Sequence, residues 1–223
     1  MSNALTDSAR LRRMVCAAIF VAFAYISRFF LHFNVMFLTF EIKDAIICIG
    51  GLFLGPVYAV VISFLVALIE LITISDTGLY GFIMNFLAAA VFSGVAALLY
   101  KKWKSLGGAV LSLAIGALAM VAVMMGANLV VTPFFMKQPV SVVVDLIIPL
   151  LLPFNVIKAL TNGSLVLLLY KPLTLALSRT HLIEKGSTYR INRTSLIISV
   201  VAILLLSASI LAFVFVLGGR IDV

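Results

Sequence analysis

The chain has 223 residues, of which 64% are hydrophobic and 11% are charged, and its formal net charge is +8. A soluble domain is about half apolar and about a quarter charged, so this composition excludes an ordinary soluble protein. It predicts an all-α integral membrane protein with no room for a sizeable soluble domain. In such a protein the excess of basic residues is explained by orientation in the membrane, and we expect no nucleic-acid partner.

Six apolar segments follow one another along the chain, and a bilayer-spanning helix needs ~20 such residues. They cover residues 14–33, 45–69, 79–100, 106–130, 146–170 and 195–217. The polar breaks between them are FEIKD at 40–44, ELITISDTG at 70–78, KKWKS at 101–105, TPFFMKQP at 132–139 and a basic stretch at 171–193. Because the polar N-terminal residues lead into a run long enough to remain as a helix, we expect no cleavable signal peptide.

The segment 45–69 predicts two short spans rather than one, because GGLFLGP ends in the strong turn signal Gly55-Pro56. Positive charge supports this division. The basic N-terminal residues place the N-terminus in the cytoplasm, and only the divided segment puts KKWKS and the basic stretch on the same side. The result is seven membrane segments, with the C-terminus outside. FEIKD, ELITISDTG and TPFFMKQP are then extracellular, and their acidic residues gather on the outer side.

The predicted organisation has five parts. They are a cytoplasmic segment at 1–13, a membrane bundle that binds substrate at 14–178, a basic cytoplasmic linker at 179–194, an additional transmembrane helix at 195–217 and a tail at 218–223.

PFNVIKALTNG, at 153–163, carries three polar residues in an otherwise apolar run. Asn155, Lys158 and Asn162 are spaced i, i+3 and i+7, which places them on one face of a helix. If Asp145 marks the outer end of the span, Lys158 lies roughly 20 Å along the helix axis, near the middle of the membrane. A lysine at that depth costs several kcal/mol, so we interpret it as functional.

These polar residues also have a structural interpretation. Lys158 could extend its amine to the interface or pair with an acid such as Asp44 or Glu70. Asparagine commonly bonds between helices. The predicted spans themselves contain no acid, which argues against a proton-coupled pump of familiar design.

Two prolines precede the polar face. Pro149 and Pro153 each remove a backbone donor, which predicts an irregular start of the helix. Such a start often lines a cavity, and the alternative is a simple packing kink.

Further polar candidates lie elsewhere in the chain. Asn128 ends its span just before Thr132-Pro133, and Asn85 enters a helix as a ligand contact or as a bond between helices. Asp44 either caps the cavity or solvates a helix end.

Motifs for other activities are absent. The chain has no G-x-x-x-x-G-K-[ST] loop, no H-E-x-x-H and no G-x-S-x-G. The two histidines fall on opposite sides of the predicted membrane. We therefore expect no ATPase, no catalytic residues, no metal site and no bound cofactor.

Three motifs, GGLFLGPVYAVV, NLVVTPFFM and PFNVIK, resemble those of the substrate-binding S components of energy-coupling factor (ECF) vitamin transporters. The resemblance covers about residues 10–178 and is strongest to the riboflavin-specific members. It implies a six-helix bundle in a prokaryotic plasma membrane, with a pocket on the extracellular side. It also implies two kinds of partner, a transmembrane coupling protein and a pair of cytosolic ATPases, besides the vitamin and membrane lipids.

The resemblance also implies residue roles. Asn155 and Lys158 of PFNVIK and Asn128 of NLVVTPFFM would bind the vitamin, while Ala18 and Ala22 would contact the coupling protein. Further expected substrate contacts are Asn162, Asp44, Asn85, Tyr80, Met84 and Phe134, of which Tyr80, Met84 and Phe134, together with Phe154, would supply apolar walls.

One feature departs from the resemblance, since residues 195–217 add a hydrophobic segment after the usual last helix. Two other functions stay open. An S component could bind another vitamin such as pantothenate, whose carboxylate would pair with Lys158. A membrane enzyme acting on lipid or peptide would need a nucleophile, an acid–base pair or a metal site, and the sequence shows none.

Overall fold

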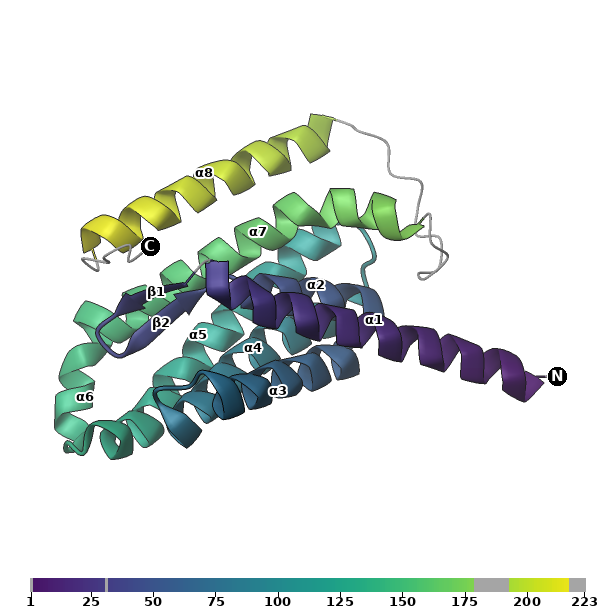
Figure 1. Ribbon diagram of the computed structural model, residues 1–223. Helices are drawn as coiled ribbons and strands as arrows, with labels where there is room; N and C mark the ends of the chain where they lie inside the picture. Colours follow the sequence, from purple (N-terminus) through teal and green to yellow (C-terminus); the bar gives the residue numbers. More distant parts are fainter. Residues whose placement is uncertain (1, 31, 179–192, 217–223) are drawn as a thin grey trace.

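The computed structural model describes residues 2–30, 32–178 and 193–216, and in them it confirms the all-α membrane fold (Figure 1). The helices are α1 (Ser2–Phe30), α2 (Lys43–Leu54), α3 (Pro56–Thr73), α4 (Gly78–Tyr100), α5 (Leu106–Met136), α6 (Val140–Leu146), the π-helical turn η1 (Ile147–Leu151), α7 (Leu152–Ser178) and α8 (Arg193–Val216). The strands are β1 (His32–Val35) and β2 (Leu38–Glu41). Within the described residues, 6 helical segments are long and apolar enough to cross a membrane.

The division of segment 45–69 is confirmed. Gly55 joins α2 to α3 with φ 108° and ψ 169°, a backbone conformation that is open essentially to glycine alone, and Pro56 begins α3. α2 has only 12 residues, so it is about 18 Å long, which is shorter than the ~30 Å hydrocarbon core of a bilayer. It packs against α1, α3, α4 and α7, and most of its residues are buried. α2 is therefore a half-length helix enclosed by the bundle.

A β-hairpin that the sequence did not predict connects α1 to α2. β1 and β2 are antiparallel, with His32 opposite Glu41 and Val35 opposite Leu38, and Met36 takes a positive φ of 54° in the turn. The hairpin lies at the end of the bundle where α7 begins (Figure 1).

Helix α5 is longer than predicted. The break expected at TPFFMKQP is wrong in its first half, because the helix continues through Thr132 and Pro133 to Met136. It ends at Lys137, which adopts a left-handed conformation with φ 53°. One proline inside a membrane helix is tolerated when neighbouring groups satisfy the carbonyl that it frees.

The irregular start of the PFNVIK helix is confirmed. α6, η1 and α7 follow one another without a break, and Pro149 lies inside the π-helical turn. A proline removes one helical hydrogen bond, and a π-helical turn is a common way for a helix to absorb that loss.

Helix α8 lies along the outside of α7 (Figure 1). Ser195, Ala202, Ser209 and Phe213 are its buried residues, and most of its other side chains are exposed. The predicted linker at 179–194 and the tail at 218–223 lie outside the described residues, except for Arg193 and Thr194 at the start of α8.

Candidate functional site

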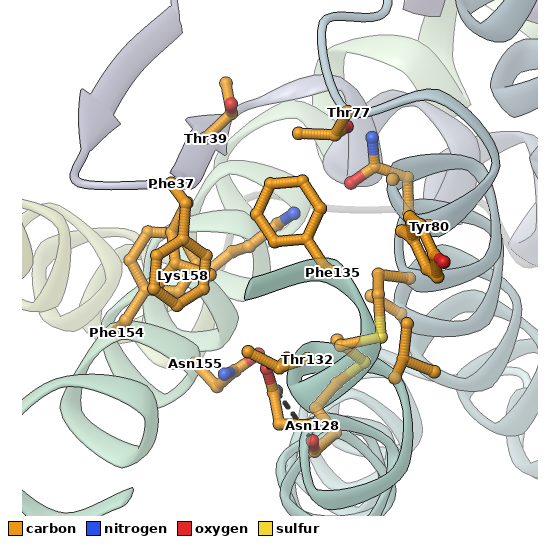
Figure 2. Close-up of a pocket in the computed structure, with 17 residues that line it drawn as sticks. Phe37, Thr39, Thr77, Tyr80, Asn128, Thr132, Phe135, Phe154, Asn155 and Lys158 are labelled. Carbon is orange, nitrogen blue, oxygen red and sulfur yellow. Dashed lines mark hydrogen bonds between the residues drawn. The ribbon is translucent and has the colours of Figure 1, made fainter. Parts of the chain in front are cut away.

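A cavity opens between the hairpin, α4, α5 and α7 (Figure 2). Its empty volume is about 700 Å³, a figure that includes the part open to solvent. Its lining residues are Phe37, Leu38, Thr39, Thr77, Tyr80, Gly81, Met84, Asn85, Ala88, Met124, Asn128, Val131, Thr132, Phe135, Phe154, Asn155 and Lys158.

Aromatic rings form much of the cavity wall. Phe37 of the hairpin turn, Tyr80 of α4 and Phe135 of α5 form a chain in which the Phe135 ring centroid lies 6.0 Å from each of the other two. Phe154 of α7 supplies a fourth ring (Figure 2). Rings from three helices and the hairpin thus surround a space that suits a flat, largely apolar ligand.

Amide side chains supply polar atoms from α5 and α7. Asn128 donates to the Met124 carbonyl at 2.8 Å and accepts from the Thr132 hydroxyl at 2.8 Å. Asn155, buried on α7, donates to the Leu151 carbonyl at 2.8 Å. Among the described residues no other hydrogen bond uses the Asn155 side chain, so its oxygen and second N–H can serve a ligand.

Lys158 lies one turn after Asn155, lines the cavity and is 4% exposed. Its Nζ lies 3.2 Å from Oδ2 of the equally buried Asp44, the first-turn acid of α2. The pairing of Lys158 with an acid is therefore confirmed, while its role in binding a substrate stays a prediction that its place in the cavity wall permits. Asp44 offsets the charge of Lys158, and the other lining residues carry no charge. The polar end of the cavity is therefore close to neutral.

Behind this pair lies a buried network of charged side chains from four elements. The Lys43 amine bridges the Glu41 and Glu70 carboxylates, and Arg28 Nη1 lies 3.1 Å from Glu41 Oε1 and 3.7 Å from Glu70 Oε2. Burial raises the pKa of the Glu41 carboxyl, but the charges of Lys43, Lys158 and Arg28 outweigh it and hold that pKa below its usual value. These three cations therefore favour the ionised form of Glu41.

The network corrects two expectations. FEIKD does not merely solvate a helix end, because Glu41, Lys43 and Asp44 are all at most 2% exposed. The membrane spans also do not lack acids, since Glu70 is buried in the last turn of α3. Glu70 directly follows the predicted span at 45–69, whereas α3 continues to Thr73.

Asn162 completes this region without lining the cavity. Its Oδ1 accepts from the Ala45 N–H at 2.9 Å, and its Nδ2 donates to the Glu41 and Lys158 carbonyls at 3.1 and 3.0 Å. These bonds use both amide hydrogens, so Asn162 ties α7 to β2 and to the first turn of α2. It holds the backbone beside Asp44, which faces Lys158.

The predicted site residues divide into two groups. The cavity is lined by Asn155, Lys158, Asn128, Asn85, Tyr80 and Met84. Asp44 and Asn162 lie behind it, and Phe134 is 68% exposed on the outside of α5, where the neighbouring Phe135 faces the cavity instead. Ala18 and Ala22 are both exposed on α1.

Sequence reasoning missed the hairpin contribution, which consists of Phe37, Leu38 and Thr39. A signal was present, because HFNV and LTFE each alternate polar and apolar residues, as short strands do. Thr77, Thr132 and Phe135 were also not singled out as ligand contacts.

Comparisons with known proteins identify the fold and the family. Residues 12–170 match the family described as "ECF transporter, substrate-specific component". A solved structure, the S component of a bacterial ECF transporter, superposes with a TM-score of 0.65 and 25% sequence identity, covering 76% of this chain and 99% of that one. A search of the curated proteins finds no match.

The family match covers most of the chain, and it includes every cavity-lining residue. Six helical segments in the described residues are also able to cross a membrane, as a transporter subunit requires. The chain therefore belongs to the family of ECF transporter substrate-specific components, and it is a substrate-binding membrane subunit of an ECF importer rather than an enzyme.

Proposed function

We propose that this chain captures riboflavin, or a closely related flavin such as FMN, in the cavity and delivers it to the energy-coupling module. One observation carries the proposal: Asn128, Asn155 and Lys158 converge from two helices on a single cavity with aromatic walls. These are the residues that the resemblance to riboflavin-specific S components assigns to the vitamin.

The chemistry of the cavity supports a flavin. The isoalloxazine ring is flat and aromatic, so it can pack against Phe37, Phe135 and Phe154. Its carbonyl and imide edge needs both donors and acceptors, which the amides of Asn128 and Asn155 offer. The ribityl hydroxyls need several small polar groups, and Thr39 and Thr77 line the other end of the cavity (Figure 2).

The charge at the polar end of the cavity favours a neutral group beside Lys158, such as the ring edge of riboflavin or FMN, over the carboxylate of pantothenate. Lys158 is already neutralised by Asp44 at 3.2 Å. A carboxylate ligand would have to share that amine with a buried acid, and placing two negative charges beside one buried cation is unfavourable. An uncharged carbonyl can accept a hydrogen bond from Lys158 without disturbing the pair.

Delivery requires partners. The chain has no ATPase motif, so energy would come from a transmembrane coupling protein and two cytosolic ATPases, with Ala18 and Ala22 on α1 as the contact with the coupling protein. Exposed small residues let another helix approach closely. We place the chain in a prokaryotic plasma membrane with the N-terminus in the cytoplasm, and its exposed apolar side chains contact lipid.

Fluorescence tests the proposal on the protein purified in detergent. Riboflavin fluorescence should be quenched on binding with a stoichiometry of about one, since aromatic side chains enclose the ring. Excess pantothenate should leave the quenching unchanged. Displacement by pantothenate would contradict the flavin assignment and favour a carboxylate vitamin.

A further inference from the structure

Helix α8 lies outside the part of the chain that matches the family, which ends at residue 170. It nevertheless packs closely on α7. Ser195, Ala202 and Ser209 recur every seven residues on one side of α8 and are all at most 3% exposed. Small residues at this spacing form a seam along which two membrane helices can approach closely. α8 is thus docked on the bundle along one defined face.

The largest buried side chain of α8 stands at the cavity end of this seam. Phe213 is 4% exposed, and its ring centroid lies 5.0 Å from that of Phe40 in β2. Phe40 in turn meets Phe154 edge to face at 6.3 Å, and Phe154 lines the cavity. Val35, Leu150 and Ile157 are the other buried members of the same apolar cluster. A chain of three rings therefore connects α8 to the cavity wall.

The hairpin is the part of the wall that most needs such support. Each strand has 4 residues, and an isolated two-stranded hairpin is marginally stable at best. Its residues Phe37, Leu38 and Thr39 line the cavity. Polar bonds at Glu41 anchor one end of β2, while the apolar face at Val35 and Phe40 rests on α7 and α8.

We propose that Phe213 is a positioning residue for ligand binding, which holds the hairpin over the cavity through Phe40 and Phe154. Through this packing contact, α8 slows the opening of the hairpin and the exit of the ligand. The effect on ligand exit rests on the proposed flavin function, whereas the effect on hairpin opening does not.

Two substitutions on the same helix test this proposal. Phe213→Ala removes the ring that reaches Phe40, and Phe215→Ala removes a ring that is 81% exposed two residues away. In the ligand-free full-length protein, amide hydrogen exchange at residues 32–41 should accelerate about tenfold or more in Phe213→Ala. With riboflavin as the probe, the dissociation rate should rise by a similar factor. Phe215→Ala should match the unsubstituted protein in both rates.

Amide hydrogen exchange in α4 and α5 distinguishes a local effect on the hairpin from destabilisation of the whole bundle. It should stay unchanged in Phe213→Ala. Phe213→Leu keeps part of the contact and should give intermediate rates; if the alanine variant does not fold, the leucine variant is judged by the same two rates. Equal hairpin exchange in the Phe213 and Phe215 variants would overturn the proposal. Absence of riboflavin binding in every variant would refute the flavin function, while hairpin exchange would still decide the role of Phe213.

Discussion

At the scale of single residues, Lys158 has two tasks that substitution can separate. It lines the cavity, and it neutralises the buried carboxylate of Asp44 at 3.2 Å. Removing one partner of a buried pair leaves the other charge uncompensated, whereas removing both is often nearly neutral. The stability of the fold and the affinity for ligand therefore need not change together.

Lys158→Met should destabilise the protein by about 3–5 kcal/mol, because it leaves the Asp44 carboxylate buried without its partner. It should also weaken riboflavin binding by one to two orders of magnitude, since a hydrogen bond to a charged group contributes on the order of 1.5–3 kcal/mol. Adding Asp44→Asn should recover most of the melting temperature without recovering the affinity. Recovery of both in the double variant would contradict a ligand contact and leave Lys158 a purely structural residue.

Two asparagines on α7 offer a second contrast. Counted over the described residues, the Asn155 side chain makes one hydrogen bond and lines the cavity, while the Asn162 side chain makes three and lies behind it. Asn155→Ala should weaken riboflavin binding about tenfold with little change in melting temperature. Asn162→Ala removes the three hydrogen bonds that tie α7 to β2 and to the first turn of α2, although the Ala45 N–H keeps its 3.1 Å bond to the Ile42 carbonyl. At about 0.5–1.5 kcal/mol for each net hydrogen bond, the substitution should mainly lower the melting temperature. The opposite pattern in thermal melts and titrations would refute these assignments.

At the scale of elements, two glycines determine the geometry of the junction between α2 and α3. Gly55 has φ 108°, and a Cβ on Gly51 would lie 2.6 Å from the Ala59 Cβ, so both glycines are required for α3 to fold back on α2. This turn makes α2 a half-length helix, and the first turn of that helix carries Asp44 to Lys158.

Alanine at either junction glycine should destabilise the protein by about 1–3 kcal/mol, through overpacking at Gly51 and backbone strain at Gly55. Gly126 is a matched control, because a Cβ there meets nothing within 4 Å and the residue lies inside α5. Gly126→Ala should therefore melt at or above the temperature of the unsubstituted protein, since alanine favours helix. Equal losses at all three positions would show that the junction is not special.

Elements of different length were predictable to different degrees. Long apolar runs predicted the spanning helices, and the turn signal Gly55-Pro56 predicted the division of α2 from α3. The hairpin was missed because its strands have 4 residues each, too few for a periodic pattern to stand out. The predicted end of α5 is too early because a proline such as Pro133 usually interrupts a helix, whereas this helix continues past it.

The site was predictable where polar residues interrupt an apolar helix, as at Asn128, Asn155 and Lys158. It was not predictable where the assignment depends on helix rotation or tertiary contacts. Phe134 and Phe135 are adjacent in sequence, and only the rotation of α5 decides that Phe135 faces the cavity. The burial of FEIKD likewise depends on Arg28 and Glu70, which come from other helices.

At the scale of the whole molecule, the predicted orientation assigns opposite sides to the two ends of the bundle. The hairpin and the cavity are expected to face the exterior, and the KKWKS turn between α4 and α5 is expected to face the cytoplasm. Met36, 72% exposed in the hairpin turn, and the exposed Lys102 mark these two ends.

Cysteines placed at these positions test the orientation in intact cells. A membrane-impermeant thiol reagent should label Met36→Cys and should label Lys102→Cys only after the cells are opened. The native Cys16 and Cys48 are both buried, so background labelling should be low. Labelling of Lys102→Cys in intact cells would reverse the orientation and place the cavity on the wrong side for uptake.

A flavin held in the cavity would give the folded, purified protein the absorption spectrum of a flavin. We expect this spectrum in the protein as isolated, or after riboflavin is added and the excess removed, with about one flavin per chain. The same preparation of Lys158→Met should retain much less. A folded protein that carries no flavin under either condition would contradict the claim and leave an S component for another substrate.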